Sequence, residues 1–144
     1  MSAFTQAEID YLNEQRLGRL ATVDARGQPY VVSVGFTYNQ ELGTIDIAGR
    51  SLGQSAKFRH VAGDERVAFV VDDLLPPWEP RGVRIRGTAE ALSDESSPFM
   101  APWGARVSEL IRITPTHVTS WGLENKNGYV SNSRKVSSSG SEGD

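Results

Sequence analysis

The sequence of 144 residues carries a formal net charge of −3, no cysteine and no internal repeat. The absence of cysteine excludes disulfides, iron–sulfur clusters, thiolate metal sites and a thiol nucleophile, and the absence of a basic surplus argues against a nucleic-acid partner. No signal peptide opens the chain and no apolar run is long enough to span a membrane, so we expect a cytoplasmic protein without a membrane anchor.

The N-terminal residues predict a capped helix followed by a β-hairpin. Thr5 and Glu8 have the spacing of a capping box, and apolar residues at helical spacing predict a helix over 6–17, with the next glycine as its C-terminal cap. Alternation of residue types then predicts strands over 19–24 and 30–38, joined by a turn that contains glycine, proline and aspartate. The second strand presents apolar side chains on one face and small side chains on the other.

The middle of the chain predicts a turn, a short helix and a buried strand. A turn over 39–43 precedes a short strand over 44–48, and two glycines and two serines then lead into a helix over 54–62. The unbroken apolar run within 66–71 predicts a strand that is buried on both faces. The three prolines and the tryptophan of 72–81 predict a loop.

The remaining segments predict three more strands. Residues 82–92 alternate in character and predict a strand, whereas 93–106 is polar, contains two prolines and predicts an irregular connection. The last strands are expected over 109–114 and 117–121, interrupted by Pro115 because proline cannot donate a ladder hydrogen bond.

Together these elements predict one mainly β domain over residues 1–125. Six or seven short strands with short links, one N-terminal helix and one or two further short helices are typical of a small antiparallel barrel, whose sheet edges must be closed or covered. Residues 126–144 are polar and become rich in serine and glycine, so we expect a flexible C-terminal tail.

An anion site is the strongest chemical hypothesis that the residues support. Arg50, Ser51, Ser55 and Lys57 cluster around the start of the predicted helix. Free backbone N–H groups and the positive end of the helix dipole favour a phosphate there, and Lys57 adds a point charge. The alternative is that Ser51 or Ser55 is only an N-cap and that Lys57 is a solvated surface lysine.

Two further features are compatible with a flat ligand. Small side chains on one face of the strand over 30–38 allow a ring to approach its backbone, although the same pattern fits a barrel strand that lines its own core. Trp78 lies in the proline-rich loop and must pack on something. Three placements are open: Trp78 packs on its own barrel, it packs on a partner subunit, or it covers an aromatic ring as a lid.

No catalytic residues can be assigned from the sequence. Its histidines are His60, interpreted as a solvated helix residue, and His117, interpreted as a core or edge residue. No metal-binding spacing is present, so no metal site is predicted. Arg84 and Arg86 share one strand face, which we interpret as a solvated outer face.

Several segments of the chain, in the same order along the sequence, resemble the pyridoxamine 5′-phosphate oxidase-like flavoproteins. The resemblance covers 18–123, and although each motif alone is weak, the ordered set is fairly specific. The segments that carry it are ATVDARGQPY at 21–30, AKFR at 56–59, DERVAFVVD at 64–72, GVRIRGTAEAL at 82–92 and PTHVTSWGL at 115–123.

The resemblance implies a fold, an oligomeric state and a cofactor. The fold is the FMN-binding split β-barrel, and the protein is a homodimer with two cofactor sites between its subunits. Lys57 stands where the family has a lysine that binds the cofactor phosphate. Val32 replaces an arginine that grips the FMN phosphate in the oxidases, Ala56 replaces a basic residue, and the C-terminal substrate-binding segment of the oxidases is missing. These departures favour the deazaflavin coenzyme F420 over FMN.

The function implied by this resemblance is that of an F420-dependent reductase. Such an enzyme transfers a hydride to a small unsaturated substrate, polycyclic or quinone-like in character, and the cofactor carries the chemistry without catalytic side chains. The alternatives are an FMN-binding oxidase or reductase of the same fold, and a protein that binds the cofactor without turnover. By position in the family, the residues expected at the ring are Val32, Ser33 and Val34. Those expected at the phosphate are Arg50, Ser51, Ser55 and Lys57, and Trp78 is expected to close the pocket.

Overall fold

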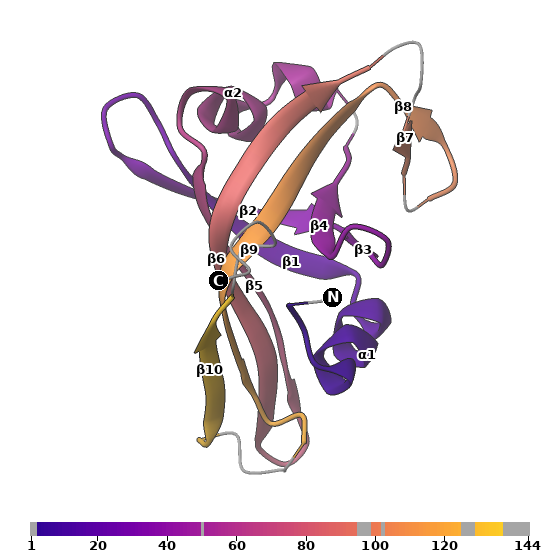
Figure 1. The fold of residues 1–144 in the computed structure, drawn as a ribbon, viewed down its shortest axis with the longest axis vertical. Coiled ribbons are helices and arrows are strands. Elements are labelled where there is room, and N and C mark those ends of the chain that lie inside the picture. The colour runs from indigo at the N-terminus through magenta and orange to yellow at the C-terminus, as the bar shows by residue number, and fades with distance from the viewer. Residues whose placement is uncertain (1–2, 50, 95–98, 102, 125–128, 137–144) are drawn as a thin grey trace.

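The computed structural model describes residues 3–49, 51–94, 99–101, 103–124 and 129–136 (Figure 1). The helices of these residues are α1 (Gln6–Glu14), the 3₁₀ helix η1 (Leu52–Gln54) and α2 (Ala56–Gly63). The strands are β1 (Leu17–Val23), β2 (Pro29–Gly35), β3 (Thr37–Asn39), β4 (Thr44–Ile47), β5 (Arg66–Leu75), β6 (Glu79–Ser93), β7 (Phe99–Met100), β8 (Arg106–Val107), β9 (Glu109–Trp121) and β10 (Ser131–Lys135). Within the described residues, no helix is long and apolar enough to cross a membrane.

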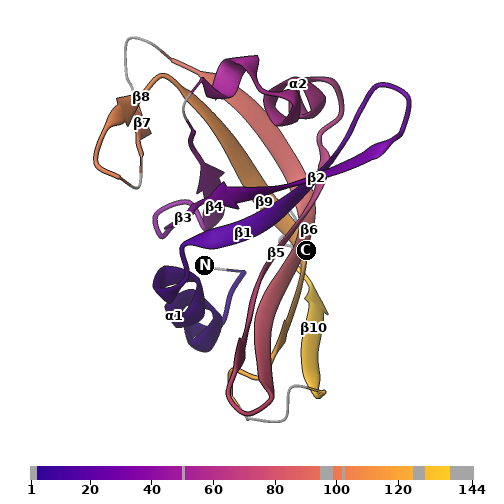
Figure 2. The ribbon, with the colours of Figure 1, turned by 180° about the vertical axis from the view of Figure 1, so that it is seen from behind.

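One curved antiparallel sheet makes up most of the fold. In the part of the chain that the structure describes, its strands follow the order β2-β1-β5-β6-β9-β4-β3, and β10 pairs with β9. The edge strands β2 and β3 are consecutive in the sequence, yet no ladder joins them within those residues, so the barrel is split. This arrangement confirms the predicted split β-barrel. Figures 1 and 2 show α1 beside β1 and β3, and α2 near the end opposite to the β5–β6 turn.

The core lies inside the curved sheet and is built from alternate residues of its strands. The strand predicted to be buried on both faces, β5, instead alternates: Phe69 and Val71 are fully buried, whereas Ala68 and Val70 are half-buried on the outer face. This is the ordinary two-residue period of a strand with one core face. The largest buried side chains of the strands are Leu20, Ile45, Ile47, Phe69, Ile85, Ile111 and Ile113.

The capping box at the start of α1 is confirmed, but the predicted end of the helix is wrong. The Thr5 hydroxyl accepts a hydrogen bond from the Glu8 N–H at 3.2 Å, and the Glu8 carboxylate accepts one from the Thr5 N–H at 2.9 Å. The helix ends at Glu14 instead of residue 17. Gly18 is a buried residue of β1, where a Cβ atom would lie 2.3 Å from the Phe69 ring. Its role is therefore to admit an aromatic side chain, not to cap the helix.

The loop predicted over 72–81 is a hairpin with a short turn. β5 continues to Leu75 and β6 begins at Glu79, so the prolines occupy the turn and the first residues of β6. Asp73 and Arg81 face each other across the two strands and form an ion pair of 2.7 Å. Cross-strand pairs of opposite charge favour this pairing, which the proline content of the sequence concealed.

Pro115 does not interrupt the last long strand. The two strands predicted on either side of it form the single strand β9, and the register between β6 and β9 shifts between Arg86 and Gly87. A Cβ atom at Gly87 would lie 2.2 Å from the carbonyl oxygen of Thr114. A glycine opposite the proline thus allows the strands to stay in contact through a bulge.

The connections around α2 and before β9 follow the predictions more closely. The helix predicted over 54–62 is confirmed as α2, which begins two residues later because η1 and the N-cap Ser55 precede it. The irregular connection predicted over 93–106 contains the small β7–β8 pair. Residues 95–98 and 102 of that connection lie outside the described residues.

The C-terminal tail is not wholly irregular. Residues 131–135 form β10 and pair with the end of β9, which corrects the expectation of a flexible tail for this part of the chain. The expectation for 126–128 and 137–144 falls outside the described residues. The boundary of the domain at residue 125 stays a prediction.

A buried carboxylate holds β10 in place. The Glu8 side chain is 1% exposed and accepts hydrogen bonds from the Ser120 hydroxyl and from both terminal nitrogens of Arg134. Arg134 also donates to the carbonyl oxygen of Ala3 at 2.7 Å. One cluster therefore joins α1, β9 and β10, and the composition of the tail gave no sign of it.

Candidate functional site

The start of α2 combines an ordinary helix cap with unused hydrogen-bond donors. The Ser55 hydroxyl accepts from the Phe58 N–H at 3.3 Å and donates to the Leu52 carbonyl at 2.6 Å, so it acts as the N-cap that the simpler interpretation predicted. Within the described residues, the N–H groups of Ala56 and Lys57 have no acceptor, as is usual in the first turn of a helix.

Two side chains next to this cap are available to a ligand. Lys57 is half-buried and forms no hydrogen bond or ion pair with any described residue. Ser51 is exposed and adopts a left-handed conformation with φ of 53°, which turns the chain into η1. Arg50, the fourth residue of the predicted anion site, lies outside the described residues. The remaining donors suit a phosphate group, which accepts several N–H and hydroxyl hydrogen bonds.

A carboxylate lies beside the same segment. The Gly53 N–H donates to the Glu109 carboxylate at 3.1 Å, and a Cβ atom at Gly53 would lie 2.2 Å from it. A side chain at position 53 would therefore displace the Glu109 carboxylate from this hydrogen bond. Glu109 fixes η1 against the sheet and places one negative charge near the donors of α2.

His60 attaches α2 to the hairpin that carries the predicted ring-binding strand. Its Nδ1 lies 2.9 Å from the Thr22 hydroxyl, and its ring meets that of Tyr30 edge-on, with the ring centroids 5.1 Å apart. The interpretation of His60 as a solvated residue is therefore wrong, because both contacts hold it against β1 and β2. His117 is half-buried on β9, with Nδ1 3.1 Å from the Thr116 hydroxyl.

The predicted ring-binding strand, β2, is an edge of the sheet. Val34 is buried and Val32 packs partly against the same core, so these two side chains line the barrel as the alternative interpretation predicted. Ser33 is exposed on the outer face. A flat ligand at this strand therefore meets the Ser33 side chain and the backbone instead of the valine side chains.

Trp78 lies far from the α2 donors within one chain. It stands in the turn after β5, is 65% exposed and donates from Nε1 to the Tyr129 hydroxyl at 3.1 Å. α2 leads into the other end of β5, whose ten residues span about 30 Å. Figure 1 shows the turn and α2 at opposite ends of the molecule. The structure does not bring Trp78 and Lys57 together in one subunit.

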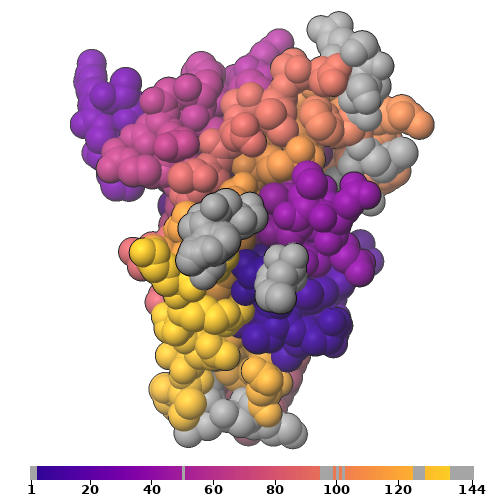
Figure 3. Space-filling view, viewed as in Figure 1, coloured from indigo at the N-terminus to yellow at the C-terminus, as the bar shows by residue number. Residues whose placement is uncertain are grey.

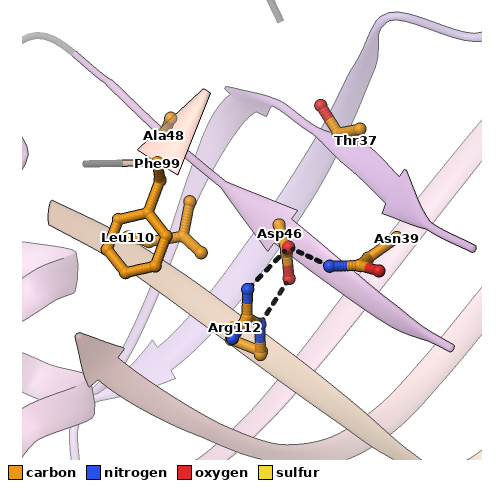
Figure 4. A pocket seen from close by; sticks show the side chains of 7 residues that line it. All are labelled: Thr37, Asn39, Asp46, Ala48, Phe99, Leu110 and Arg112. Atoms are coloured by element: carbon orange, nitrogen blue, oxygen red, sulfur yellow. Dashed lines mark hydrogen bonds and ion pairs between the residues drawn. The ribbon is translucent and has the colours of Figure 1, made fainter. Parts of the chain in front are cut away.

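A cavity of about 270 Å³ lies where β3, β4, β7 and β9 meet (Figure 4). Asp46 on β4 accepts two hydrogen bonds from Arg112 on β9, from Nε at 3.0 Å and from a terminal nitrogen at 3.1 Å. The amide of Asn39 and the hydroxyl of Thr44 also donate to Asp46, each at 2.9 Å. The guanidinium lies 5.9 Å from the centroid of the Phe99 ring.

Sequence reasoning missed this cavity because its charged residues are distant in the sequence. Asp46 and Arg112 are 66 positions apart, and each stands between two isoleucines of an alternating strand. That alternation indicates an outward-facing polar residue in both places. It does not indicate that β4 pairs with β9, which is what brings the two side chains together.

The chain is similar to a known family and to a named relative over most of its length. A family model described as pyridoxamine 5′-phosphate oxidase matches residues 4–127. The 5a,11a-dehydrotetracycline/5a,11a-dehydrooxytetracycline reductase of Streptomyces rimosus is 50% identical over 126 residues, which cover 84% of each protein.

Solved structures of low sequence identity share the fold. A conserved hypothetical protein of Mycobacterium tuberculosis has a TM-score of 0.65 and 22% identity, with 97% of this chain and 96% of that chain covered. An FAD-binding protein of Mycobacterium smegmatis has a TM-score of 0.61 and 20% identity, with 83% and 96% covered. These matches establish the split-barrel architecture of the chain.

Proposed function

Because the chain belongs to the pyridoxamine 5′-phosphate oxidase family, we propose that it is a reductase that uses coenzyme F420 to reduce a carbon–carbon double bond in a polycyclic substrate. The observation that carries this proposal is the 50% identity, over 84% of the chain, to a protein named as a dehydrotetracycline reductase. The chain is an oxidoreductase on that basis. Its proposed substrate is a fused-ring molecule in which the double bond is conjugated to carbonyl groups.

A flavin-type cofactor agrees with both the family and the fold. Structural neighbours from Mycobacterium smegmatis and Mesorhizobium loti are named as FAD-binding proteins. The choice of F420 over FMN rests on Val32 and Ala56, which stand where the resemblance to the oxidases implies basic residues that hold the FMN phosphate. When bound, the reduced cofactor supplies a hydride to one carbon of the double bond, and a proton from water completes the reduction at the other.

The residues of the chain contribute binding and orientation in this proposal. Lys57, the Ser51 hydroxyl and the free N–H groups at the start of α2 hold the cofactor phosphate. The exposed face of β2 at Ser33 would lie against the ring, and backbone N–H groups there would stabilise negative charge at its edge. Holding the reacting atoms at contact distance is the main source of the rate.

The proposed site is shared between two subunits. In one chain Trp78 is at the opposite end of β5 from Lys57, so Trp78 closes the site of the partner subunit in a homodimer. Two-fold association is the commonest oligomeric form and allows this exchange of elements. The cytoplasmic location stays a prediction from the sequence.

The experiment that tests the proposal is an equilibrium titration with F420, FMN and FAD, followed by turnover assays with reduced F420 and a dehydrotetracycline. We expect F420 to bind at least about tenfold more tightly than either flavin, which is a difference of about 1.4 kcal/mol. Equal affinities or a preference for FMN would instead identify an FMN enzyme of the same fold. Tight F420 binding without oxidation of the reduced cofactor by any polycyclic substrate would identify a cofactor-binding protein.

A further inference from the structure

We infer that the Asp46–Arg112 cavity binds the oxygen-rich end of the polycyclic substrate and that Arg112 determines which substrates fit. The inference rests on the proposed function and names a subsite for it. Asp46 fixes the side chain of Arg112, and further guanidinium N–H groups of Arg112 remain to donate hydrogen bonds to a ligand (Figure 4).

Arg112 is held in one orientation while most of its N–H groups remain unused. A guanidinium has five N–H donors, and two of these donate to Asp46. Within the described residues the others have no acceptor. The Arg112 side chain is 20% exposed, and it lines the cavity. Because Asp46 already restrains the Arg112 side chain, binding of a ligand that accepts from it does not cost the conformational entropy of ordering that side chain.

The charges of the cavity select the kind of oxygen that Arg112 can bind. Asp46 neutralises Arg112 and is itself only 12% exposed. A phosphate or a simple carboxylate placed on Arg112 would meet the Asp46 carboxylate as a like charge. Carbonyl and enol oxygens accept the same hydrogen bonds without a full localised charge. The pair therefore favours adjacent carbonyl and hydroxyl oxygens on a ring, as in an enolised β-dicarbonyl group.

The walls of the cavity suit one end of a flat molecule. Phe99 and Leu110 offer apolar surface, and Thr37 and Asn39 offer polar groups at the other side. The volume of about 270 Å³ is below the range of roughly 300–1,000 Å³ that is usual for complete ligand sites. A fused-ring substrate therefore places one end in the cavity and extends beyond it.

The position of the cavity places that remaining part next to the proposed cofactor site. Thr37 begins β3, two residues after the end of β2, which carries Ser33. On the other side Ala48 lines the cavity and directly precedes the segment of 49–57 that leads into α2. Residues that line the cavity are thus continuous in the chain with both segments assigned to the cofactor, and we expect the rest of a substrate held by Arg112 to extend toward them.

The test compares Arg112→Gln and Arg112→Lys with wild type in two measurements. The first is calorimetric binding of tetracycline to the F420-loaded protein, and the second is the separation of KM from kcat in dehydrotetracycline reduction. We expect Arg112→Gln to weaken tetracycline binding and to raise KM by about 10- to 100-fold, which is the loss of a charge-assisted hydrogen bond. Arg112→Lys should recover part of this affinity, and the Kd for F420 should change less than about twofold.

Two further variants separate recognition from folding. The double variant Asp46→Asn with Arg112→Gln removes both charges together, so no carboxylate is left unpaired, and it should fold with KM still raised. Arg66→Gln breaks the exposed Arg66–Asp64 pair and should leave both measurements unchanged. The inference is overturned if the folded Arg112→Gln variant binds tetracycline as tightly as wild type. It is also overturned if the wild-type protein binds no tetracycline. Arg112-dependent binding without turnover would refute the proposed reductase function and keep the subsite.

Discussion

At the scale of single residues, Lys57 carries the clearest functional expectation. It is a half-buried cation without an ion-pair partner among the described residues, next to two N–H groups that also lack acceptors. A structural lysine would normally be solvated or paired, so this placement favours a ligand as its partner. Glu109 lies nearby through its contact with Gly53, and its negative charge lowers the affinity of the segment for anions.

Replacing Lys57 should weaken the cofactor complex without unfolding the protein. Lys57→Ala loses a charge-assisted hydrogen bond, so we expect the Kd for F420 to rise by about 10- to 150-fold, while the melting temperature hardly changes because alanine is the better helix former. Lys57→Arg should recover part of the affinity. Titrations with melting curves measure both effects. As a control, Arg59→Ala removes another cation from the same helix, and an equal loss there would show that only the net charge matters.

At the scale of secondary-structure elements, the cluster of Glu8, Ser120 and Arg134 is the main tie between distant parts of the chain. Burial acts to raise the pKa of Glu8, but the hydrogen bonds from Arg134, from Ser120 and from the Thr5 N–H outweigh it and hold that pKa below the usual 4.5. A lowered pKa in the folded state means that the ionised carboxylate contributes stability above its unfolded-state pKa. This contribution is lost as the pH falls through the lower, folded-state value.

The cluster predicts a specific pattern of acid stability. Glu8→Gln leaves Arg134 without its carboxylate, so we expect the free energy of unfolding at pH 7 to fall by about 3 kcal/mol. The melting temperature of wild type should decrease as the pH is lowered from neutral to below 4.5, the usual pKa of a glutamate, and the variant should show a smaller decrease. Thermal unfolding across this pH range measures both. Glu14→Gln, an exposed position at the end of the same helix, should behave as wild type, and an equal effect there would refute the special role of Glu8.

The accuracy of sequence reasoning at this scale depended on how local each signal is. The capping box of Thr5 and Glu8 lies within one helical turn, and the alternation of β2 or β6 lies within one strand, so both were predictable. The Asp46–Arg112 and Glu8–Arg134 pairs each join residues more than 60 positions apart and require knowledge of which strands are neighbours. The roles of Gly18 and Gly87 could not be predicted either, because each glycine makes room for a side chain or carbonyl group of a segment distant in the sequence.

At the scale of the whole molecule, three apolar side chains lie in a row on the outer face of the sheet near the proposed site. The partner registers place Val31 of β2 beside Ala21 of β1, and Ala21 beside Ala68 of β5. Val31 is 67% exposed. Small apolar side chains in a row across three strands let two sheets approach closely, which supports association of two copies through this face.

A homodimer with shared sites makes a prediction that a monomer does not. Light scattering should return twice the chain mass of 15.7 kDa. Lys57→Ala and Trp78→Ala should each impair turnover, and mixed dimers of the two should contain one intact site, because the intact Lys57 and Trp78 then come from different chains. Refolding the two variants together should restore up to about a quarter of wild-type activity.

The outcome of that mixing experiment separates the two arrangements. If each site belonged to a single chain, every site in the mixed dimer would carry one of the two substitutions and no activity would return. A wild-type monomer at micromolar concentration would contradict the shared site directly. Mixing wild type with either variant controls for losses during refolding.

The strand β10 has a consequence for anyone who wishes to shorten or extend this protein. Composition suggests residue 125 as a safe place to cut, since the sequence beyond it is polar. A protein ending there would lack Arg134, the cation that pairs with the buried Glu8 carboxylate and joins β10 to α1. Breaking a buried ion pair costs up to roughly 3–5 kcal/mol, less where water reaches the remaining charge, out of a total stability of about 5–15 kcal/mol for a typical domain. Fusions and labels therefore belong beyond Val136, whose N–H still donates to the Thr116 carbonyl oxygen of β9 at 2.8 Å.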